Sequence, residues 1–578
     1  MDCSFIKELT KLRKLSIESV ENSDNFGAFQ EYMHVQRDVE LDLIELLNKV
    51  KNLNKCLILL CGSAGDGKSH LLAYLKNHGL LDDYDIYNDA TESISPEMTA
   101  MQTLNKKLES FNDLNLYGND SIKVIIAINL GTLNNFIESE YGGNFNYLKE
   151  YINTHNIFSS GQEEEDDNNS LFHYLSFSDY QVFSLLENDI DCTFVDSLFD
   201  RVFFKTMDNP FYKKFHENHN CNLCDVCPVR HNYQFMQNKT NRDNVRNRII
   251  EVIVKNKVIV SAREILNFIF DILVHPELGV ISSGDLANYL NNEEKYFGKY
   301  LSWTTPMLLD EFSDVSNFLN VVRKHDPLLN RLSETDAETI RFNSADNIWP
   351  MYTFAVEKQS YDRLTTVHKD IIKDGSVPIK SELKNKMYKF IVRLNHLTSS
   401  MYKDNDLDEY LRYLYSYYTG NDDEIYMLYE NCQNAVMKWN GDFGRKLCCI
   451  DDSNEDFYVL ENLVINPYPL QPCENVPQKF NKFSPVIKLT FFTKNNEDQK
   501  VSINVDYELY SLFKSIADGY RPTVQDKNQH ADFAGFIIKL QNLGDLSEEI
   551  IIKPKFGNDA DTLKFYKLIS NKFKVEKA

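Results

Sequence analysis

A glycine-rich loop between an apolar run and a helical pattern constrains the fold of this chain most. The stretch reads LILLCGSAGDGKSHLLAYL from Leu57 to Leu75. Its first four residues form a short continuous apolar run, which is typical of a buried parallel strand. From His70 onward the apolar residues recur at helical spacing. Strand, loop and helix in this order predict an α/β fold with the loop at the N-terminus of a helix.

The spacing within the loop matches a phosphate-binding loop, in which a glycine is followed, after four residues, by Gly-Lys-Ser. Glycines let the backbone bend so that N–H groups point at a phosphate, and the following helix directs its positive end at the same anion. We expect Lys68 to reach the β and γ phosphates of ATP and the Ser69 hydroxyl to ligate Mg²⁺. The alternative is a glycine-rich turn without a ligand. The predicted nucleotide-binding residues are Gly62, Ser63, Ala64, Gly65, Asp66, Gly67, Lys68, Ser69 and His70.

Hydrolysis of ATP also requires a carboxylate near the magnesium and a residue that orients the attacking water. A candidate strand over residues 84–88 is followed by Asp89 and, close behind, Glu92. The stronger apolar run Ile122–Ile128 ends in Asn129 instead of an acid. We interpret Asn129 as a polar sensor of the γ-phosphate or the water, and Asp89 or Glu92 as the catalytic acid.

The region after residue 88 has an alternative interpretation without catalysis. Asp89 or Thr91 is also placed to cap a helix over residues 97–111, because Asp and Thr are favoured at helix N-caps. This alternative leaves the identity of the acid open.

An arginine further along the chain is a candidate for a second phosphate sensor. Arg263 lies in the first turn of a predicted helix that Ser261 caps, where a cation is unfavourable to the helix dipole. We expect it to contact the γ-phosphate, with a surface salt bridge to Glu264 as the alternative. The basic groups that come next as candidates are Arg242, Arg246 and Arg248.

The residues before the first strand offer an apolar cover for a base. Tyr32, Met33 and Val35 form an aromatic and apolar patch ahead of an amphipathic helix that begins at Arg37. The patch is a candidate cover for the adenine, and ordinary core packing is the interpretation that we favour.

Three cysteines separated by two residues each predict a metal site. Two-residue gaps allow Cys221, Cys224 and Cys227 to converge on one ion, and His231 follows four positions later. His216 and His219 precede the cluster as further donors. We expect structural Zn²⁺ or an iron–sulfur cluster in an insert over about residues 208–235, and free thiols are the alternative.

The length of 578 residues predicts several domains. We expect residues 1–280 to form an α/β P-loop NTPase domain of the AAA+/ASCE-like kind, with a helical lid and the cysteine-rich insert. Residues 281–450 have a mainly helical pattern, and their many tyrosines favour packing over stacking on nucleic-acid bases. Residues 455–578 change to a β-rich period and predict a small α+β interaction domain with an antiparallel sheet.

Composition limits the compartment and the partners. No run of about 20 apolar residues predicts a membrane span, and no apolar signal core is present near residue 1. Eleven cysteines, an odd number, favour reduced thiols and a cytoplasmic location. The net charge of −24 predicts that this chain reaches DNA mainly through partners.

Six segments, in order, resemble one bacterial family. They read FQEYMHVQRDVE, CGSAGDGKSHLLAYL, NDATES, IIAINLGTLNNF, CNLCDVCPVRHNY and VSAREILNFIFDIL. The set is similar to the DNA phosphorothioation-dependent restriction protein family DptF, also called DndF, and a later GYRPT segment fits its C-terminal part.

The resemblance implies an ATPase component of an anti-phage defence that attacks DNA without sulfur in its backbone. It implies DptG-like and DptH-like partner proteins, and it assigns ATP and Mg²⁺ to Gly62, Gly65, Gly67, Lys68 and Ser69. We therefore expect an ATP-hydrolysing subunit, a candidate homo-oligomer, that couples nucleotide state to assembly or activation on unmodified DNA. The alternative is an ATP-gated scaffold with little or no turnover. No nuclease constellation stands out, so cleavage is not expected of this chain.

Overall fold

The computed structural model describes most of the chain, and every structural statement below refers to the residues it describes. These are residues 3–21, 26–88, 98–118, 120–158, 170–217, 227–280, 293–311, 316–329, 333–358, 381–399, 404–444, 447–451, 453–473, 476–493, 496–543, 549–556, 562–567 and 573–577.

The chain forms two compact units. The first comprises Met1–Phe183 and Cys192–Lys403, and the second comprises Ser184–Asp191 and Asp404–Ala578. The expected boundaries lay near residues 280 and 450, whereas the contacts divide the long helical stretch near residue 403. The helix before this point packs on the first unit, and the two helices after it pack on the strands and helices of the second.

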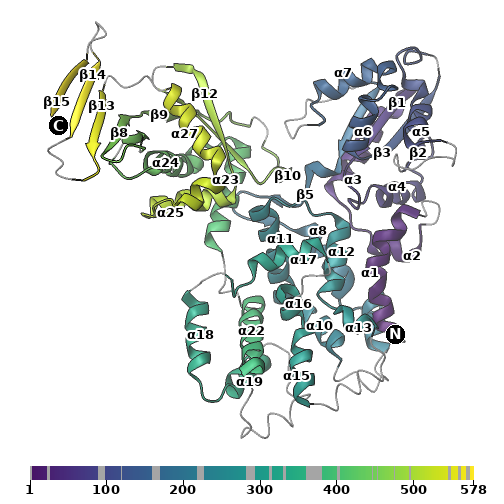
Figure 1. The fold of residues 1–578 in the computed structure, drawn as a ribbon. Coiled ribbons are helices and arrows are strands. Elements are labelled where there is room, and N and C mark those ends of the chain that lie inside the picture. Colours follow the sequence, from purple (N-terminus) through teal and green to yellow (C-terminus); the bar gives the residue numbers. More distant parts are fainter. Residues whose placement is uncertain are drawn as a thin grey trace. The chain divides into compact units, whose positions relative to one another are not determined.

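The first unit contains a four-stranded parallel sheet with the strand order β2-β3-β1-β4 (Figure 1). The strands are β1 (Lys55–Cys61), β2 (Asp85–Tyr87), β3 (Ile122–Ile128) and β4 (Phe172–Ser176). β1 is buried along its whole length and pairs in parallel with β3 on one side and β4 on the other. The parallel α/β arrangement predicted from the sequence is confirmed.

Alternate side chains of β1 enter two separate cores, as expected when both faces of a parallel sheet are covered. Leu57 and Leu59 pack with α6 (Leu130–Ile137) and α7 (Asn146–Thr154) on one face. Ile58 and Leu60 pack with the helices α3 and α4 on the other face. The bounds of the remaining elements around the sheet are α2 Ala28–Met33, α3 Asp38–Lys49, η1 Val50–Asn52, α4 Lys68–Asn77, α5 Ala100–Lys107, η2 Glu109–Phe111, η3 Gly142–Asn144 and η4 Phe177–Asp179.

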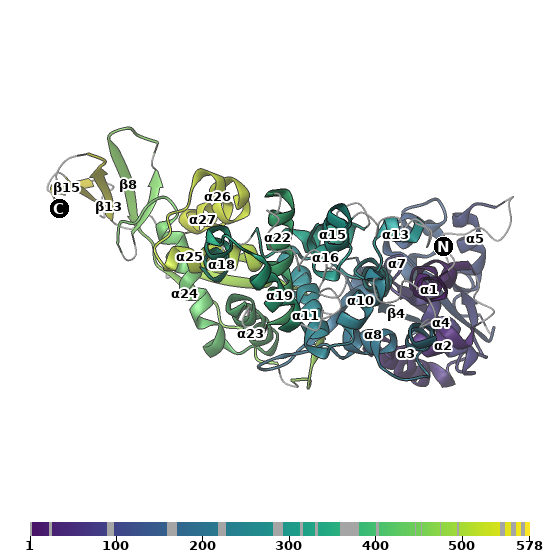
Figure 2. The ribbon, with the colours of Figure 1, turned by 90° about the horizontal axis from the view of Figure 1, so that it is seen from below.

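Helices make up the rest of the first unit. The N-terminal helix α1 (Ser4–Glu21) packs along α12. Helix α11 contacts α8, α10 and α22 (Figure 2). The bounds are α8 Thr193–Phe203, α9 Pro210–Glu217, α10 Pro228–Met236, α11 Lys239–Asn256, α12 Ala262–Asp271, α13 Pro276–Val280, α15 Glu293–Ser302, α16 Thr305–Glu311, α17 Asn317–Val322, η7 Arg323–His325, α18 Ser333–Ser344, α19 Trp349–Lys358 and α22 Ser381–Thr398.

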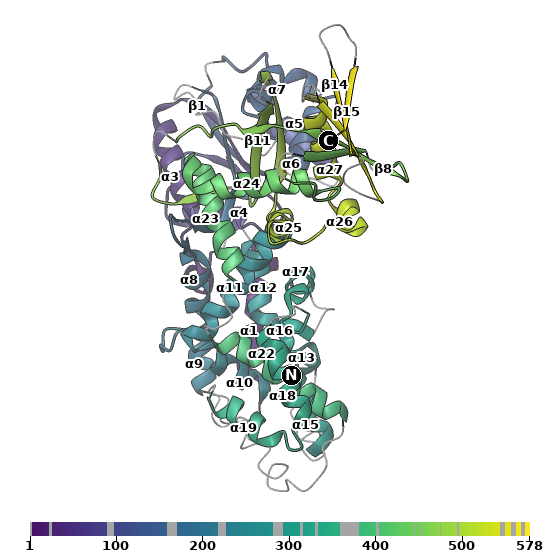
Figure 3. The same ribbon diagram turned by 90° about the vertical axis from the view of Figure 1, so that its left-hand side faces the viewer.

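The second unit combines helices with antiparallel sheets (Figure 3). One sheet has the order β12-β11-β9 and another the order β15-β14-β13-β8-β7. The antiparallel C-terminal region predicted from the sequence is confirmed. β5 (Tyr180–Leu185) begins in the first unit, and its last two residues, Ser184 and Leu185, belong to the second. The bounds of the other elements of the second unit are β6 Ile190–Asp191, α23 Asn405–Thr419, α24 Asp422–Lys438, β7 Leu447–Asp451, β8 Phe457–Asn462, β9 Ile465–Pro467, β10 Phe480–Lys482, β11 Ile487–Thr493, β12 Asn496–Val505, α25 Tyr507–Ala517, α26 Val524–Gln529, α27 Ala531–Leu543, β13 Glu549–Pro554, β14 Leu563–Lys567 and β15 Phe573–Lys577.

Several tyrosines of the aromatic-rich helices α23 and α24 lie in the core of this unit. Tyr410 is fully buried and its hydroxyl donates to the carbonyls of Pro485 and Val505, each at 3.0 Å. Tyr413 and Tyr429 are also buried. These three rings support the packing interpretation of the tyrosines, because buried rings are not exposed to stack on bases.

Candidate functional site

The glycine loop leaves the carboxyl end of β1 and ends at the first residue of α4. Gly62, Gly65 and Gly67 have φ angles of 151°, 95° and 100°, in the region where side chains are strained. A Cβ atom on Gly62 would also lie 2.8 Å from a carboxylate oxygen of Asp66. The positive φ angle and the nearby Asp66 carboxylate therefore both explain why residue 62 is a glycine.

The Asp66 side chain closes the loop from within. Its Oδ2 accepts a hydrogen bond from the backbone N–H of Ser63 at 2.5 Å, and the residue is 5% exposed. Burial raises the pKa of the Asp66 carboxyl, and the Ser63 hydrogen bond opposes this rise. The side chain thus braces the turn between residues 63 and 66.

The Lys68 ammonium group lies over the loop at the start of α4. Its Nζ donates to the carbonyls of Gly62 and Ser63, each at 2.8 Å, and to Oδ1 of Asn129 at 3.4 Å. Asn129 is the N-cap of α6 and follows the last residue of β3. The structure therefore brings together Lys68 and Asn129, both predicted site residues, which lie beyond the ends of two neighbouring strands.

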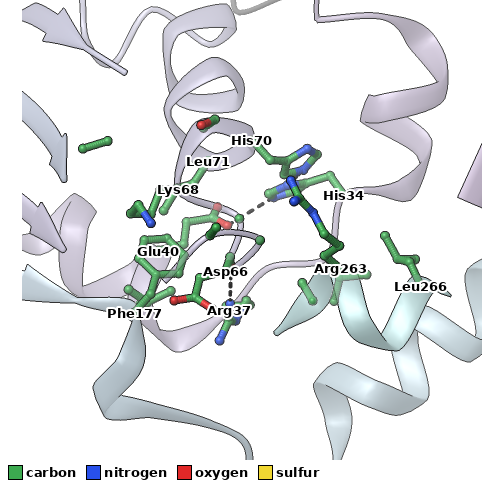
Figure 4. Close-up of a pocket in the computed structure, with 18 of the residues that line it drawn as sticks. His34, Arg37, Glu40, Asp66, Lys68, His70, Leu71, Phe177, Arg263 and Leu266 are labelled. Carbon is green, nitrogen blue, oxygen red and sulfur yellow. Dashed lines mark hydrogen bonds and ion pairs between the residues drawn. The ribbon is translucent and has the colours of Figure 1, made fainter. Parts of the chain in front are cut away.

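A cavity of about 300 Å³ opens beside the loop. Lys68 and Phe177 lie at one side of the view in Figure 4, and His34, His70, Arg263 and Leu266 lie at the other. Polar lining is provided by Lys68, Ser69, Asn88 and Asn129. Apolar lining is provided by Met33, Val35, Leu198 and Leu266. The cavity thus has polar groups where phosphates are expected and apolar side chains suited to a base.

The residues offered as a cover for the adenine reach the cavity only in part. Met33 and Val35 line the cavity. Tyr32 does not, because its hydroxyl donates to the Arg201 carbonyl at 2.7 Å and its ring lies beneath the Arg201 guanidinium. The tyrosine therefore joins α2 to α8 instead of facing the cavity.

Two histidines and a glutamate lie close together at the cavity wall. Nδ1 of His34 lies 3.1 Å from Nε2 of His70, and Nε2 of His34 lies 3.1 Å from Oε2 of Glu40. The His34 ring stacks on Tyr74 with the ring centres 3.5 Å apart. Burial, and secondarily the neighbouring His34, lowers the pKa of His70 to about 4, so His70 is neutral near pH 7.

Sequence reasoning did not identify His34, Arg37 or Glu40 as cavity residues. Arg37 donates from Nη1 to the carbonyl of Asp66 at 2.9 Å. All three come from the segment between α2 and the first turn of α3, and no local pattern distinguishes them from ordinary residues of a half-buried turn and helix. Their nearness to the loop arises only when α3 packs on the sheet.

The first turn of α12 contacts the glycine loop directly. The backbone N–H of Arg263 donates to the Gly65 carbonyl at 3.3 Å, and the Arg263 side chain lines the cavity. The alternative partner, Glu264, instead accepts from the Ser261 N–H at 2.8 Å as part of a helix cap. Arg263 therefore lies beside the loop, and its contact with a γ-phosphate stays a prediction.

The three runner-up arginines lie elsewhere. Arg242 pairs with Asp200 at 3.2 Å, and Arg246 pairs with Asp196 at 2.8 Å. Arg248 is buried and donates to the His325 carbonyl. None of the three lines the cavity.

Asp89, Thr91 and Glu92, which the sequence offers as acid or helix cap, lie outside the described residues. The last described residue before them is Asn88, which lines the cavity at the carboxyl end of β2. Within the described part of the chain, its buried Oδ1 has no hydrogen-bond partner. The strand that precedes the candidate acids therefore ends at the cavity.

The predicted metal site is described at two of its four residues. Cys221 and Cys224 lie outside the described residues. Cys227 precedes α10, and burial raises the pKa of its thiol to about 11. His231 is buried in α10 with Nδ1 hydrogen-bonded to the Tyr300 hydroxyl. Over the described ranges alone, no group of three His, Cys, Asp or Glu side chains is arranged to hold a metal ion, and the metal site stays a prediction.

Comparison with known proteins gives no relative of this chain. No family model, no curated protein and no solved structure matches it. Within the described helices, none is long and apolar enough to cross a membrane.

Proposed function

We propose that this chain is a P-loop ATPase that binds ATP and Mg²⁺ at the glycine loop. The observation that supports this most is the loop itself: three glycines with positive φ join the buried strand β1 to α4, with Lys68 at the first helical position. Such a loop directs backbone N–H groups and the helix N-terminus at an anion. The adjoining cavity of about 300 Å³ supplies room for a nucleotide.

The proposal gives separate roles to Lys68, to Ser69 and to the apolar lining of the cavity. Lys68 exchanges its contacts with the Gly62 and Ser63 carbonyls for phosphate oxygens, and Ser69 supplies a hydroxyl ligand to Mg²⁺. The metal, when bound, neutralises charge on the phosphate oxygens. Met33, Val35 and Leu266 contact the base.

The strand order supports an ASCE-like arrangement, in which an additional strand separates the loop strand from the strand that carries the acid. β3 lies between β1 and β2, and both β2 and β3 end at the cavity, in Asn88 and Asn129. In the proposed reaction Asn129 orients the attacking water, and Asp89 or Glu92, just beyond β2, acts as the acid. Arg263 contacts the γ-phosphate from α12, which belongs to the proposed helical lid.

We further propose that the ATPase works in a bacterial restriction complex directed at DNA that lacks phosphorothioate modification. This part rests on the ordered resemblance to the DptF family. The partners would be DptG-like and DptH-like proteins, and the net charge of −24 favours contact with DNA through them. A Zn²⁺ ion or an iron–sulfur cluster at Cys221, Cys224, Cys227 and His231 remains part of the proposal.

An ATP-gated scaffold without useful turnover is the second candidate. The observation that favours it is the amide of Asn129 at the end of β3, the strand beside the loop strand, where an acid would serve hydrolysis directly. In that case nucleotide binding alone would order the site and its partners.

Steady-state ATP hydrolysis by the purified chain tests the proposal. The wild type is compared with Lys68→Ala and with Lys76→Ala, an exposed lysine on the same helix. We expect turnover that Lys68→Ala abolishes and Lys76→Ala preserves, with stimulation by DNA when the two partner proteins are present. Binding of ATP without turnover under every condition would favour the scaffold, and stimulation by none of these components would contradict the restriction context.

A further inference from the structure

Arg37 holds the glycine loop by a backbone carbonyl. It is the N-cap residue of α3 and has an extended backbone, with φ −117° and ψ 157°. Its Nη1 donates to the carbonyl of Asp66 at 2.9 Å, and a dashed line marks this bond in Figure 4. The contact connects α3 to the loop, and it lies within the proposed nucleotide site.

Two aromatic rings fix the guanidinium in place. Its central carbon lies 4.9 Å from the centre of the Phe194 ring and 5.5 Å from that of Phe177. Phe194 belongs to α8, and Phe177 follows β4. Arg37 is therefore positioned by elements on two sides, and guanidinium groups favour such stacking on aromatic faces.

The hydrogen bond determines the direction of a loop N–H group. The carbonyl of Asp66 and the N–H of Gly67 belong to one planar trans peptide group, in which they point in opposite directions. Because Arg37 holds the carbonyl, the Gly67 N–H points away from Arg37. Gly67 itself is the left-handed N-cap of α4, next to Lys68.

The preceding carbonyl is held in a similar way. The Gly65 carbonyl accepts the Arg263 N–H at 3.3 Å. Two consecutive loop carbonyls are thus bound by groups outside the loop, which restricts the peptide orientations before any ligand arrives. Preorganised N–H donors cost no rearrangement when an anion binds.

The positively charged Arg37 side chain also lacks an ion-pair partner among the described residues. The negative charges of Asp66 and Asp38 favour its charged form. Burial lowers its pKa, which reflects the loss of solvation of the cation. A partly buried cation is stabilised when an anionic ligand binds nearby.

We propose that Arg37 is a positioning residue for the diphosphate or triphosphate group of the ligand. It keeps the Gly67 N–H directed at the β-phosphate. It also adds positive charge beside the loop. This inference rests on the proposed nucleotide binding at the same site.

Binding of MgATP and MgADP, measured by calorimetry, tests the inference. Arg37→Met removes the donor and the charge while keeping an apolar stem between the rings, and Arg37→Lys keeps the charge and one donor. We expect Arg37→Met to weaken both nucleotides by about tenfold or more, in line with the loss of a charged hydrogen bond. Arg37→Lys should recover much of that loss.

Arg230→Met is the matched control. Arg230 is buried, lies 4.0 Å from the Phe215 ring and donates to the Phe215 carbonyl at 2.7 Å, so it makes the same two kinds of contact away from the cavity. We expect it to lower the melting temperature without changing nucleotide affinity. If Arg37→Met does not fold, Arg37→Lys is compared with wild type instead. We then expect a smaller loss of nucleotide affinity in Arg37→Lys, without a matching change in helicity or melting temperature.

Two results would overturn the inference while leaving nucleotide binding intact. One is a wild type that binds ATP and a folded Arg37 variant that binds it equally well. The other is an equal loss of affinity in Arg230→Met, which would assign the effect to general destabilisation. A wild type that binds neither nucleotide would instead reject the proposed function, and this inference with it.

Discussion

The backbone of the glycine loop passes through the left-handed region at Gly62, Gly65 and Gly67. These three positions differ in what surrounds them. A Cβ on Gly65 would meet the Arg263 side chain at 3.1 Å, whereas a Cβ on Gly67 would meet nothing within 4 Å. Gly67 is therefore required for its backbone conformation alone, which makes it the cleaner site for a test.

Substitution Gly67→Ala should strain the loop without a steric clash. A left-handed conformation costs an alanine about 1–2 kcal/mol, so we expect a loss of that order in the free energy of unfolding and weaker ATP binding. Urea denaturation and calorimetry measure the two effects. Gly131→Ala, in the first turn of α6 with open space and no positive φ, is the control and should raise stability by about 0.5–1 kcal/mol. Equal stability of Gly67→Ala and wild type would contradict the account of the loop.

Buried ion pairs connect the helices of the first unit. Arg393 of α22 donates to both carboxylate oxygens of Asp326, which follows η7, at 3.3 and 2.7 Å. Both residues are buried. A buried cation that loses its partner is strongly destabilising, so this pair fixes α22 against the neighbouring helices.

Substitution Asp326→Ala should destabilise the protein by about 3–5 kcal/mol, because it leaves Arg393 buried without its acid. The double variant Asp326→Leu with Arg393→Met should lose much less, since neither charge remains. Urea unfolding of the single and double variants measures both. A double variant as unstable as Asp326→Ala would show that packing, and not the unpaired charge, accounts for the loss.

Asp310 of α16 gives the same region a dependence on pH. Burial raises the pKa of Asp310 to about 7, and Arg248, 3.8 Å away, opposes the shift. In the unfolded chain an aspartate has a pKa of about 3.9, so the folded state binds the proton more strongly. The stabilising contribution is therefore complete below about pH 4 and is lost as the pH rises through about 7.

The free energy of unfolding of wild type, relative to Asp310→Asn, should consequently fall between about pH 5 and pH 8. Chemical denaturation across this range measures the difference. A difference that stays constant, or that rises with pH, would show that Asp310 is already ionised in the folded protein at pH 5.

Strands and helices with a clear local sequence pattern were predicted correctly. The continuous apolar runs gave β1 and β3, the helical spacing after His70 gave α4, and the cap at Ser261 gave the start of α12. β4 was not identified, because its sequence FHYLS interrupts the apolar run with polar residues. Its pairing partner, β1, lies more than a hundred residues earlier, and no local signal encodes that pairing.

The candidate site shows the same division. Lys68, Asn129 and Arg263 follow from the motif and from strand or helix ends, and the structure brings all three to one cavity. His34 and Arg37 reach the cavity through the packing of α3 on the sheet, which a single sequence does not reveal. The signal closest to finding them was the neighbouring apolar patch at Met33 and Val35, which the sequence offers as a candidate cover for the base.

On the scale of the whole molecule, every residue that lines the cavity belongs to the first unit. The second unit contributes antiparallel sheets and a buried aromatic core. Its boundary near residue 403 could not be located from sequence, because helices precede and follow it without a change of period.

The net charge of −24 predicts how the whole chain behaves toward DNA. Phosphates repel a protein with this balance, so the chain alone should bind duplex DNA no more tightly than non-specific proteins do, with a Kd of about 10⁻⁴ M or weaker at about 150 mM salt. Fluorescence anisotropy of a labelled duplex measures this. Submicromolar binding by the chain alone would reveal a local basic surface and contradict the partner-mediated view.

Titration calorimetry of MgATP with wild type and Lys68→Ala tests whether the glycine loop binds a nucleotide. We expect one site per chain in the wild type and an affinity at least about tenfold weaker in Lys68→Ala, because in the proposed site the ammonium group contacts the phosphates. Absence of binding by the wild type, or equal affinity in both proteins, would contradict a nucleotide site at the glycine loop.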